Sequence, residues 1–268
     1  MPTRCLEGLF CFFSFNSIYC LVVYARKIGK LGETRIDLVK LPPHTMWSGE
    51  AQPLFVGDVH ARPELVISAL EMADSLGAKP LFLGDLLDGP GGASGSAECV
   101  RLVRKSGAEC ILGNHELYPI FAKDQSQLAL WWGDDPESET AQRIWEEWMA
   151  VKSLLSDEDL KWLRNQPLWI RGEGWIAVHA KVPETLPAQK VETEVTALHI
   201  ACADHTGSKP FWAESYDGRF GHAYFGHTRL SKVQKYSWRH ATLLDWDAKK
   251  GGTAAVALPG GAVVPLPG

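Results

Sequence analysis

The chain lacks any block of lysine or arginine residues, and its formal net charge is −5. A groove that binds a nucleic-acid backbone needs concentrated positive charge, so we expect no nucleic-acid partner. The six cysteines include no CxxC pair, and three of them lie in one apolar N-terminal run. This spacing is typical of buried, reduced thiols rather than of a disulfide framework or a zinc knuckle. No internal repeat and no linker divides the chain into two domains.

Charge is also missing near the N-terminus. No charged residue occurs from Gly8 to Ala25, a stretch of eighteen residues, whereas a membrane span usually needs about 20. Three interpretations stay open: an extension that is dispensable or not native, a membrane anchor, and a secretory signal. The basic residues that follow this stretch would keep the rest of an anchored chain in the cytoplasm.

These features divide the chain into three parts. We predict an apolar N-terminal extension over residues 1–45, one folded domain over 46–258, and a loosely held Pro/Gly-rich tail over 259–268. With 268 residues and 46% hydrophobic content, the chain can bury one large core. We expect a cytoplasmic protein, with membrane contact only if residues 8–25 are a genuine anchor.

Short apolar runs alternate with helical patterns in the first half of the chain. Residues 53–57, 80–84 and 109–112 are predicted strands, and the stretches 63–77 and 96–105 are predicted helices. Strands that alternate with helices are typical of a sheet built from parallel crossovers. Ligands of such sheets bind beyond the carboxyl ends of the strands.

The second half begins with a mostly helical region over 117–166 and then turns to strands. A hairpin is predicted over 168–178, a strand over 223–225, and a closing hairpin over 241–258, with its strands at 241–246 and 254–258. Gly221-His222 imitates a motif described below, but no apolar strand precedes it, so we assign it no metal.

Five short polar blocks stand where the apolar runs end. They are Gly57-Asp58-Val59-His60, Gly84-Asp85-Leu86-Leu87-Asp88, Gly113-Asn114-His115-Glu116, Val178-His179 and Gly226-His227. Aspartate, histidine and asparagine offer the oxygen and imidazole donors that hard or borderline divalent cations prefer. Taken together, the blocks supply a ligand set for two adjacent ions, and two ions about 3.5–4 Å apart are a standard device for hydrolysing phosphate esters.

The order of the blocks suggests how the ligands are shared. Asp58 and His60 lie two residues apart, so a turn there can bring both to one ion. Asp85 ends the neighbouring strand, where its carboxylate can bridge two ions. The second ion would be completed by the remaining predicted ligands, Asn114, His179 and His227.

These blocks resemble those of the calcineurin-like metallophosphoesterases, nearest to the phosphoprotein-phosphatase branch and its bacterial and phage members. The resemblance covers roughly residues 52–258. It implies an α/β fold with four α/β/β/α layers, in which two mixed β-sheets pack face to face with helices outside. It also implies that Asp58, His60 and Asp85 hold one metal, and that Asp85, Asn114, His179 and His227 hold the other. Arg229 stands where other branches carry a second metal-binding histidine, which favours the phosphatase branch.

The expected reaction is hydrolysis of a phosphate monoester by in-line attack of a metal-bridging hydroxide. His115 can protonate the leaving group, and Asp88 can accept a hydrogen bond from its imidazole and raise the pKa. Mixed Asp/His/Asn ligands suit Mn²⁺ best, with Fe or Zn²⁺ as alternatives. The substrate would be a phosphoprotein or a small phosphoester.

The chain departs from this family at the phosphate-binding positions. Gly89 stands where the family usually has an arginine directly after Asp88, and the segment 211–214 carries Glu214 rather than a second arginine. The loop 89–95 is then either a donor of backbone N–H groups to phosphate or a flexible linker. Four cations are candidates for a relocated phosphate clamp: Arg62, Lys181, Arg219 and Arg229.

Three functions therefore stay open. The first is a two-metal phosphatase similar to serine/threonine phosphatases. The second is a hydrolase of dinucleoside polyphosphates, whose family shares these blocks. The third is a metal-binding scaffold without turnover, which the missing arginines suggest and which the presence of Asp88 and His115 disfavours.

Overall fold

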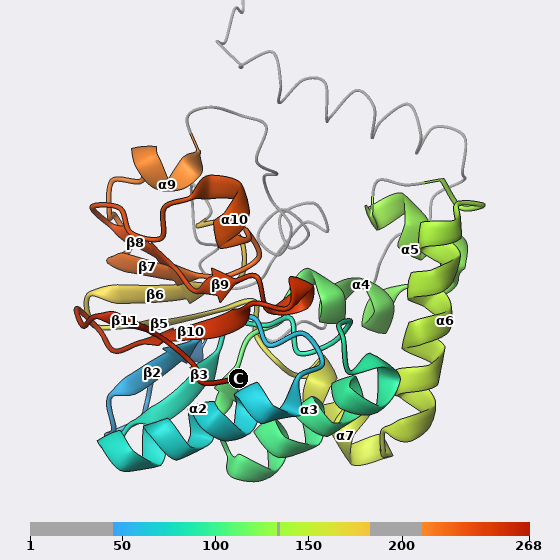
Figure 1. Ribbon diagram of the computed structural model, residues 1–268, viewed down its shortest axis with the longest axis horizontal. Helices are drawn as coiled ribbons and strands as arrows, with labels where there is room; N and C mark the ends of the chain where they lie inside the picture. Colours follow the sequence, from blue (N-terminus) through green and yellow to red (C-terminus); the bar gives the residue numbers. More distant parts are fainter. Residues whose placement is uncertain (1–44, 133–134, 183–210) are drawn as a thin grey trace, which may run out of the picture. The chain divides into compact units, whose positions relative to one another are not determined.

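Two β-sheets form the centre of the computed structural model, which describes residues 45–132, 135–182 and 211–268. All of these residues belong to one unit of the chain, Ile36–Gly268. One sheet has the strand order β11-β10-β2-β3-β4, with β9 paired to β10, and the other has the order β1-β5-β6-β7-β8 (Figure 1). Residues 1–44 of the predicted N-terminal extension, which include the apolar stretch 8–25, lie outside the described residues. Within the described part of the chain, none of the helices is long and apolar enough to cross a membrane.

The first sheet is built from parallel crossovers, as predicted. Its strands β2 (Pro53–Val56), β3 (Lys79–Phe82) and β4 (Glu109–Cys110) pair in parallel. Helix α2 (Pro63–Leu76) connects the first two, with a proline at its start and Gly77 in the left-handed conformation at its end. Helix α3 (Gly92–Ser106) connects the next two and begins four residues before the predicted start.

The second sheet contains the predicted hairpin. Strands β5 (Trp169–Gly172) and β6 (Trp175–Val178) pair antiparallel through a two-residue turn in which Gly174 has a φ of 75°. Strands β7 (His222–Phe225) and β8 (Ala241–Leu243) extend this sheet in parallel. On the other side of β5 lies the short strand β1 (Thr45–Met46).

Because side chains alternate along a strand, each sheet makes apolar contacts on both of its faces. In β2, Phe55 belongs to the cluster between the sheets, whereas Leu54 and Val56 belong to the cluster that the helices cover. Phe55 stacks on Tyr224 of the other sheet, with 3.8 Å between ring centroids, and meets Trp175 edge to face. The sheets therefore pack face to face with helices outside, and the predicted four-layer α/β/β/α fold is confirmed.

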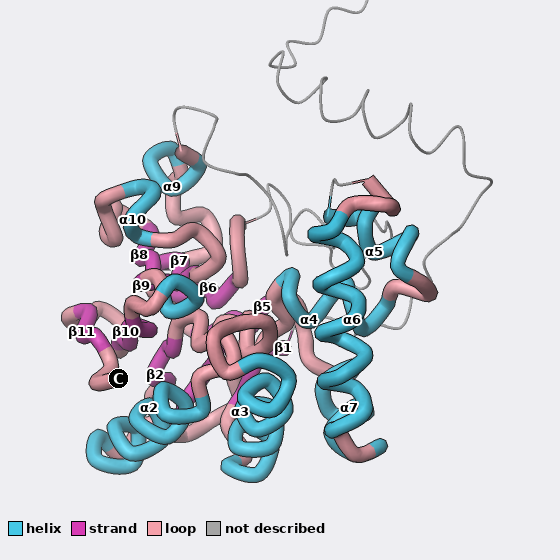
Figure 2. The backbone as a smooth tube through the Cα atoms, turned by 45° about the vertical axis from the view of Figure 1, so that its right-hand side comes forward, coloured by secondary structure: helices cyan, strands magenta, loops and turns pink. Residues whose placement is uncertain are grey.

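The remaining helices follow β4 and lie beside the sheets, with α6 packed against α3 (Figure 2). Helix α6 begins after Ser138, whose hydroxyl accepts a hydrogen bond from the amide of Ala141, and α7 begins after Ser156 in the same way. Their bounds are α4 (Asn114–Phe121), α5 (Gln125–Trp132), α6 (Glu139–Leu154), α7 (Asp157–Arg164), α9 (Trp212–Ser215) and α10 (Leu230–Val233).

The predicted strand over 241–246 is divided between the two sheets. After β8, strand β9 (Asp245–Trp246) pairs with β10 (Thr253–Ala257) of the other sheet. Leu244 makes this exchange possible, because its amide donates to Phe225 of one sheet and its carbonyl accepts from Ala255 of the other. A 3-10 turn, η2 (Ala248–Lys250), connects β9 and β10.

The tail is held more firmly than we predicted. Residues Val263–Pro265 form strand β11, which pairs antiparallel with β10. The amide of Leu266 donates to the carbonyl of Ala254, and Thr253 donates through its hydroxyl to Leu266. The prolines of this segment are tolerated because β11 is an edge strand.

Candidate metal centre

All six predicted ligands follow strands at the same end of the two sheets. Asp58 and Asp85 come after β2 and β3, and Asn114 comes after β4 at the start of α4. His179 and His227 come after β6 and β7 of the second sheet. Because parallel strands end at one edge and the two sheets pack face to face, these loops converge on one place.

Asp85 lies between two groups of imidazoles. Its Oδ2 atom is 3.6 Å from Nε2 of His60 and 3.8 Å from Nε2 of His115. Its other oxygen, Oδ1, is 3.3 Å from Nε2 of His179. The ligand atoms of Asp85 and two imidazoles cluster closely enough for one ion in each group, His60–Asp85–His115 and Asp85–His179–His227. A carboxylate that faces two groups can bridge two ions.

Asn114 joins the second group through its amide oxygen. Its Oδ1 atom is 3.1 Å from Nε2 of His179 and 2.9 Å from Nδ1 of His227. Asp58 adds a carboxylate to the group that contains His60, because its Oδ2 atom lies 3.8 Å from Nε2 of His60. The same oxygen accepts a hydrogen bond from the amide of His227 over 2.9 Å.

Backbone carbonyls orient two of the imidazoles. Nδ1 of His60 lies 2.9 Å from the carbonyl oxygen of Asp88, and Nδ1 of His179 lies 2.7 Å from that of Leu83. When Nδ1 carries the proton and donates it to a carbonyl, Nε2 keeps its lone pair toward the site. This is the tautomer that a metal ligand needs.

The electrostatics of the site fit a cation. Burial raises the pKa of Asp58 well above the ordinary value, and Asp245 adds to this rise. Oδ1 of Asp58 and Oδ2 of Asp245 are buried and have no hydrogen-bond partner among the described residues. Orphaned carboxylate oxygens in a buried site are costly unless a positive charge faces them, so the residues present fit divalent ions.

Without a metal ion, a protonated histidine supplies part of the positive charge that faces these carboxylates. Burial acts to lower the pKa of His179, yet the Asp85 carboxylate raises it to about 10. Burial likewise acts to raise the pKa of Asp85, but His179 and His115 hold it well below its usual range. Burial lowers the pKa of His60 to about 4, so its imidazole is neutral.

Two motif glycines let the carboxylates approach the backbone. A Cβ atom at Gly113 would lie 2.1 Å from Oδ1 of Asp85, and one at Gly226 would lie 1.8 Å from Oδ1 of Asp58. Any side chain at either position would displace a candidate ligand. The glycines of the third and fifth blocks are therefore part of the site.

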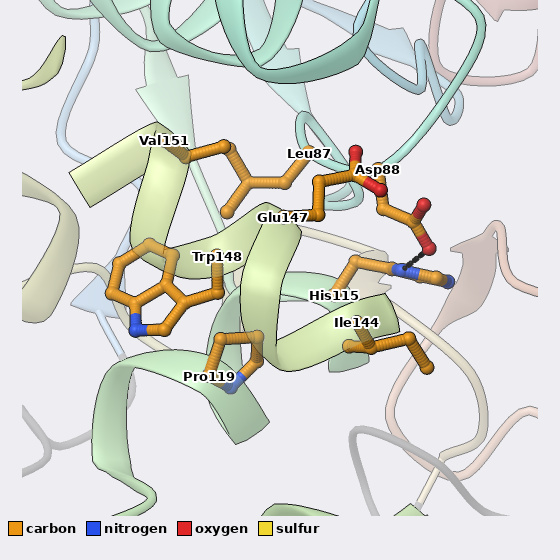
Figure 3. A pocket seen from close by; sticks show the side chains of 8 residues that line it. All are labelled: Leu87, Asp88, His115, Pro119, Ile144, Glu147, Trp148 and Val151. Atoms are coloured by element: carbon orange, nitrogen blue, oxygen red, sulfur yellow. Dashed lines mark ion pairs between the residues drawn. The ribbon is translucent and has the colours of Figure 1, made fainter. Parts of the chain in front are cut away.

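Asp88 and His115 form the expected pair beside the metal ligands. Nδ1 of His115 is 2.9 Å from Oδ2 of Asp88, as the dashed line in Figure 3 indicates. Burial acts to raise the pKa of Asp88, but His115 and Lys249 lower it far below the ordinary value. The carboxylate is therefore ionised, and Nε2 of His115 faces Asp85. Ile144, Glu147 and Trp148 of α6 line a small pocket next to this pair (Figure 3).

Glu116 is a residue whose role the sequence did not reveal. Its carboxylate is buried and accepts hydrogen bonds from the amides of Asp85, Leu87 and Gly113, at 2.8, 3.0 and 2.9 Å. It therefore connects the loops after β3 and β4, which carry two of the predicted metal ligands, Asp85 and Asn114, and His115. Its position directly after His115 was the one available signal.

Two of the predicted phosphate-binding cations contact protein groups. Nε of Arg62 lies 2.7 Å from Glu64, and its Nη1 atom donates to the carbonyl of Gly252. Nε of Arg219 lies 2.8 Å from Asp217.

The other two predicted cations lie close to the candidate ligands in the chain. Arg229 precedes α10, two residues after His227. Lys181 is partly buried and stands two residues after His179.

The loop 89–95 is neither a linker nor an open row of donors. Helix α3 begins inside it at Gly92, and the amides of Gly92 and Gly95 donate to carbonyls of Gly89 and Gly91. His222, to which we assigned no metal, stands at the start of β7, where Nε2 lies 2.8 Å from Oγ1 of Thr242.

Comparisons with known proteins place the fold and the family of this chain. Residues 53–256 match the family model described as calcineurin-like phosphoesterase. The fold is similar to that of a solved structure titled a putative diadenosine tetraphosphatase, with 21% identity, a TM-score of 0.58, and coverage of 85% of this chain and 98% of the other. It is also similar to a cold-active protein tyrosine phosphatase, with 15% identity, a TM-score of 0.50 and coverage of 87% and 83%. No curated protein matches the sequence. The chain belongs to the calcineurin-like phosphoesterase family, whose members are metal-dependent hydrolases of phosphate esters.

Proposed function

We propose that this protein is a two-metal phosphatase that hydrolyses phosphate monoesters in the manner of serine/threonine phosphatases. The observation that carries the proposal is the position of Asp85, whose two carboxylate oxygens face two separate imidazole groups. Asp58, His60 and Asp85 would hold one ion. Asp85, Asn114, His179 and His227 would hold the other.

When bound, two divalent ions would activate the attacking water and offset charge on the phosphoryl group. The protein's own contribution is the proton donor. Nε2 of His115 faces the site while its Nδ1 atom is held by Asp88 over 2.9 Å. This contact fixes the direction of the imidazole ring, so Nε2 of His115 is placed to give a proton to the leaving oxygen. Mn²⁺ is the preferred ion in this proposal, with Fe or Zn²⁺ as alternatives.

The decisive experiment is an assay of the full chain on p-nitrophenyl phosphate after removal of metal and reconstitution with Mn²⁺, Fe²⁺ or Zn²⁺ in turn. The native protein should turn over with at least one ion, whereas Asp85→Asn should be inactive with all of them. Glu71→Asn, a change on the exposed face of α2, is the matched control and should retain activity. A native protein that binds metal but hydrolyses no ester would instead favour the metal-binding scaffold.

A hydrolase of dinucleoside polyphosphates is the second candidate. Its support is the solved structure titled a putative diadenosine tetraphosphatase, almost all of which this chain covers. Separate measurements of kcat/KM on a phosphoserine peptide and on diadenosine tetraphosphate would discriminate the two. A clear preference for the dinucleotide would replace the monoester proposal.

A further inference from the structure

Position 89 cannot carry the arginine that the resemblance leads one to expect. A Cβ atom at Gly89 would lie 1.9 Å from the carbonyl oxygen of His60, far inside van der Waals contact. The backbone on both sides is constrained by the site, because His60 itself contacts the carbonyl of Asp88 through Nδ1. Any side chain at position 89 would push apart a candidate metal ligand and the residue that orients it.

A different cation stands at the pair of Asp88 and His115. The ammonium of Lys249 is 2.6 Å from Oδ2 of Asp88 and 3.3 Å from Nε2 of His115. Lys249 lies in η2, so it approaches from the connection between β9 and β10 and not from the loop after β3. It is separated from Asp88 by 161 positions in the sequence.

The backbone that carries Lys249 is firmly placed. Ala248, which precedes it, is fully buried. Asp247, directly before the turn, is held as well. Its carboxylate accepts a hydrogen bond from the amide of Ser231 over 2.9 Å, and its carbonyl accepts one from the amide of Gly252. The ammonium is thus presented by a rigid turn, which lowers the entropy lost when it binds a ligand.

The ammonium also faces the place where a substrate must react. Nε2 of His115 is 3.3 Å from Nζ of Lys249 and 3.8 Å from Oδ2 of Asp85. If a phosphate ester is held by the proposed ions and its leaving oxygen receives a proton from His115, its phosphoryl oxygens come next to this atom. An ammonium has three N–H donors, and one directed to Asp88 leaves others for such an oxygen.

We propose that Lys249 replaces the missing arginine and binds a phosphoryl oxygen of the substrate beside His115, with Asp88 holding its ammonium in place. This inference rests on the proposed phosphatase function. It adds a substrate-binding residue that none of the motifs contains. Arg143, which approaches the other oxygen of Asp88 at 3.5 Å, has a side chain that is more than half exposed.

The test compares Lys249→Met with Lys250→Met in the metal-reconstituted full chain. Lys250 belongs to the same turn and is exposed, so its variant makes the same change of charge without touching the site. Titration calorimetry with inorganic phosphate gives a readout that does not depend on turnover. A charge-assisted hydrogen bond of ordinary strength predicts that phosphate binds about 10- to 100-fold more weakly to Lys249→Met, and about equally well to Lys250→Met and the native protein.

Kinetics then separate binding from positioning. Lys249→Met should raise KM by the same factor as the phosphate dissociation constant, with a smaller change in kcat, and Lys249→Arg should restore most of the affinity. Unchanged phosphate binding in Lys249→Met would overturn the inference, and so would a loss confined to kcat, which would mean that Lys249 only positions the acid pair. Absence of turnover in the native protein would instead refute the proposed function, while the phosphate titration would still judge Lys249.

Discussion

The backbone amide of His115 donates a hydrogen bond to Oδ1 of Asp85 over 3.1 Å. The proposed proton donor and the proposed bridging ligand are thus joined directly, although 30 positions separate them in the sequence. A shift of either loop changes both the metal site and the direction of the imidazole. The positions of the metal ligands and of the pair Asp88–His115 are therefore coupled.

Asp85→Asn should remove both ions together. An amide offers one oxygen and no negative charge, so it cannot bridge two cations as a carboxylate can. Metal analysis of the dialysed variant should find far less than the native content, and hydrolysis of p-nitrophenyl phosphate should be lost. Native stoichiometry in the variant would show that Asp85 is no bridge.

His115→Ala should act mainly on poor leaving groups. A general acid contributes about 10²- to 10⁴-fold, and we expect this loss in kcat for a phosphoserine peptide. The loss should be much smaller for p-nitrophenyl phosphate, because p-nitrophenolate leaves without a proton. Asp88→Asn should follow the same pattern more weakly. An equal loss on both substrates would contradict the role of His115 as the proton donor.

Glu116→Gln should destabilise the protein and weaken metal binding. The carboxylate serves three backbone amides with two oxygens, whereas glutamine offers one oxygen and places an NH₂ group among donors. Leaving a buried donor unpaired costs about 1–3 kcal/mol, which denaturant unfolding can measure. Glu71→Gln on the exposed face of α2 is the control and should be neutral.

Asp245 should make the metal-free protein less stable as the pH rises. Burial raises the pKa of Asp245 from 3.8 to about 7, so the folded state holds a proton that the unfolded chain releases at lower pH. Stability is then lost between these two values and stays low above the higher one. In thermal unfolding with EDTA, Asp245→Asn should be more stable than the native protein at about pH 8 and should reduce the pH dependence. The exposed Asp74→Asn should leave it unchanged.

Gly89→Arg should fail to restore a phosphate clamp. The first carbon of the side chain already meets the His60 carbonyl, and overpacking of this kind costs about 1–3 kcal/mol. We expect a lower unfolding midpoint and weaker metal binding, measured together on one preparation. A stable, more active variant would mean that the backbone at position 89 yields readily.

The local pattern of the sequence was sufficient for the elements and for the order of the blocks. Apolar runs at 53–57 and 80–84 predicted strands because a continuous apolar run suits a strand in a sheet that is covered on both faces. The polar residues that follow these parallel strands were then expected at one edge of the sheet. The strand over 241–246 was predicted as one piece, since no local signal marks Leu244 as the residue at which the chain passes from one sheet to the other. The tail after Pro259 was predicted as loose because proline and glycine hide the pairing of an edge strand.

The sequence by itself determined the family, the strand-end blocks and the residue types that could bind two ions, because these are properties of short segments. Only the tertiary structure decided what surrounds them. Asp245 lies near Asp58 because β9 crosses to the first sheet, and Lys249 reaches Asp88 because η2 follows that crossing. Contacts between positions so far apart depend on the packing of two whole sheets, and no window of sequence contains that information.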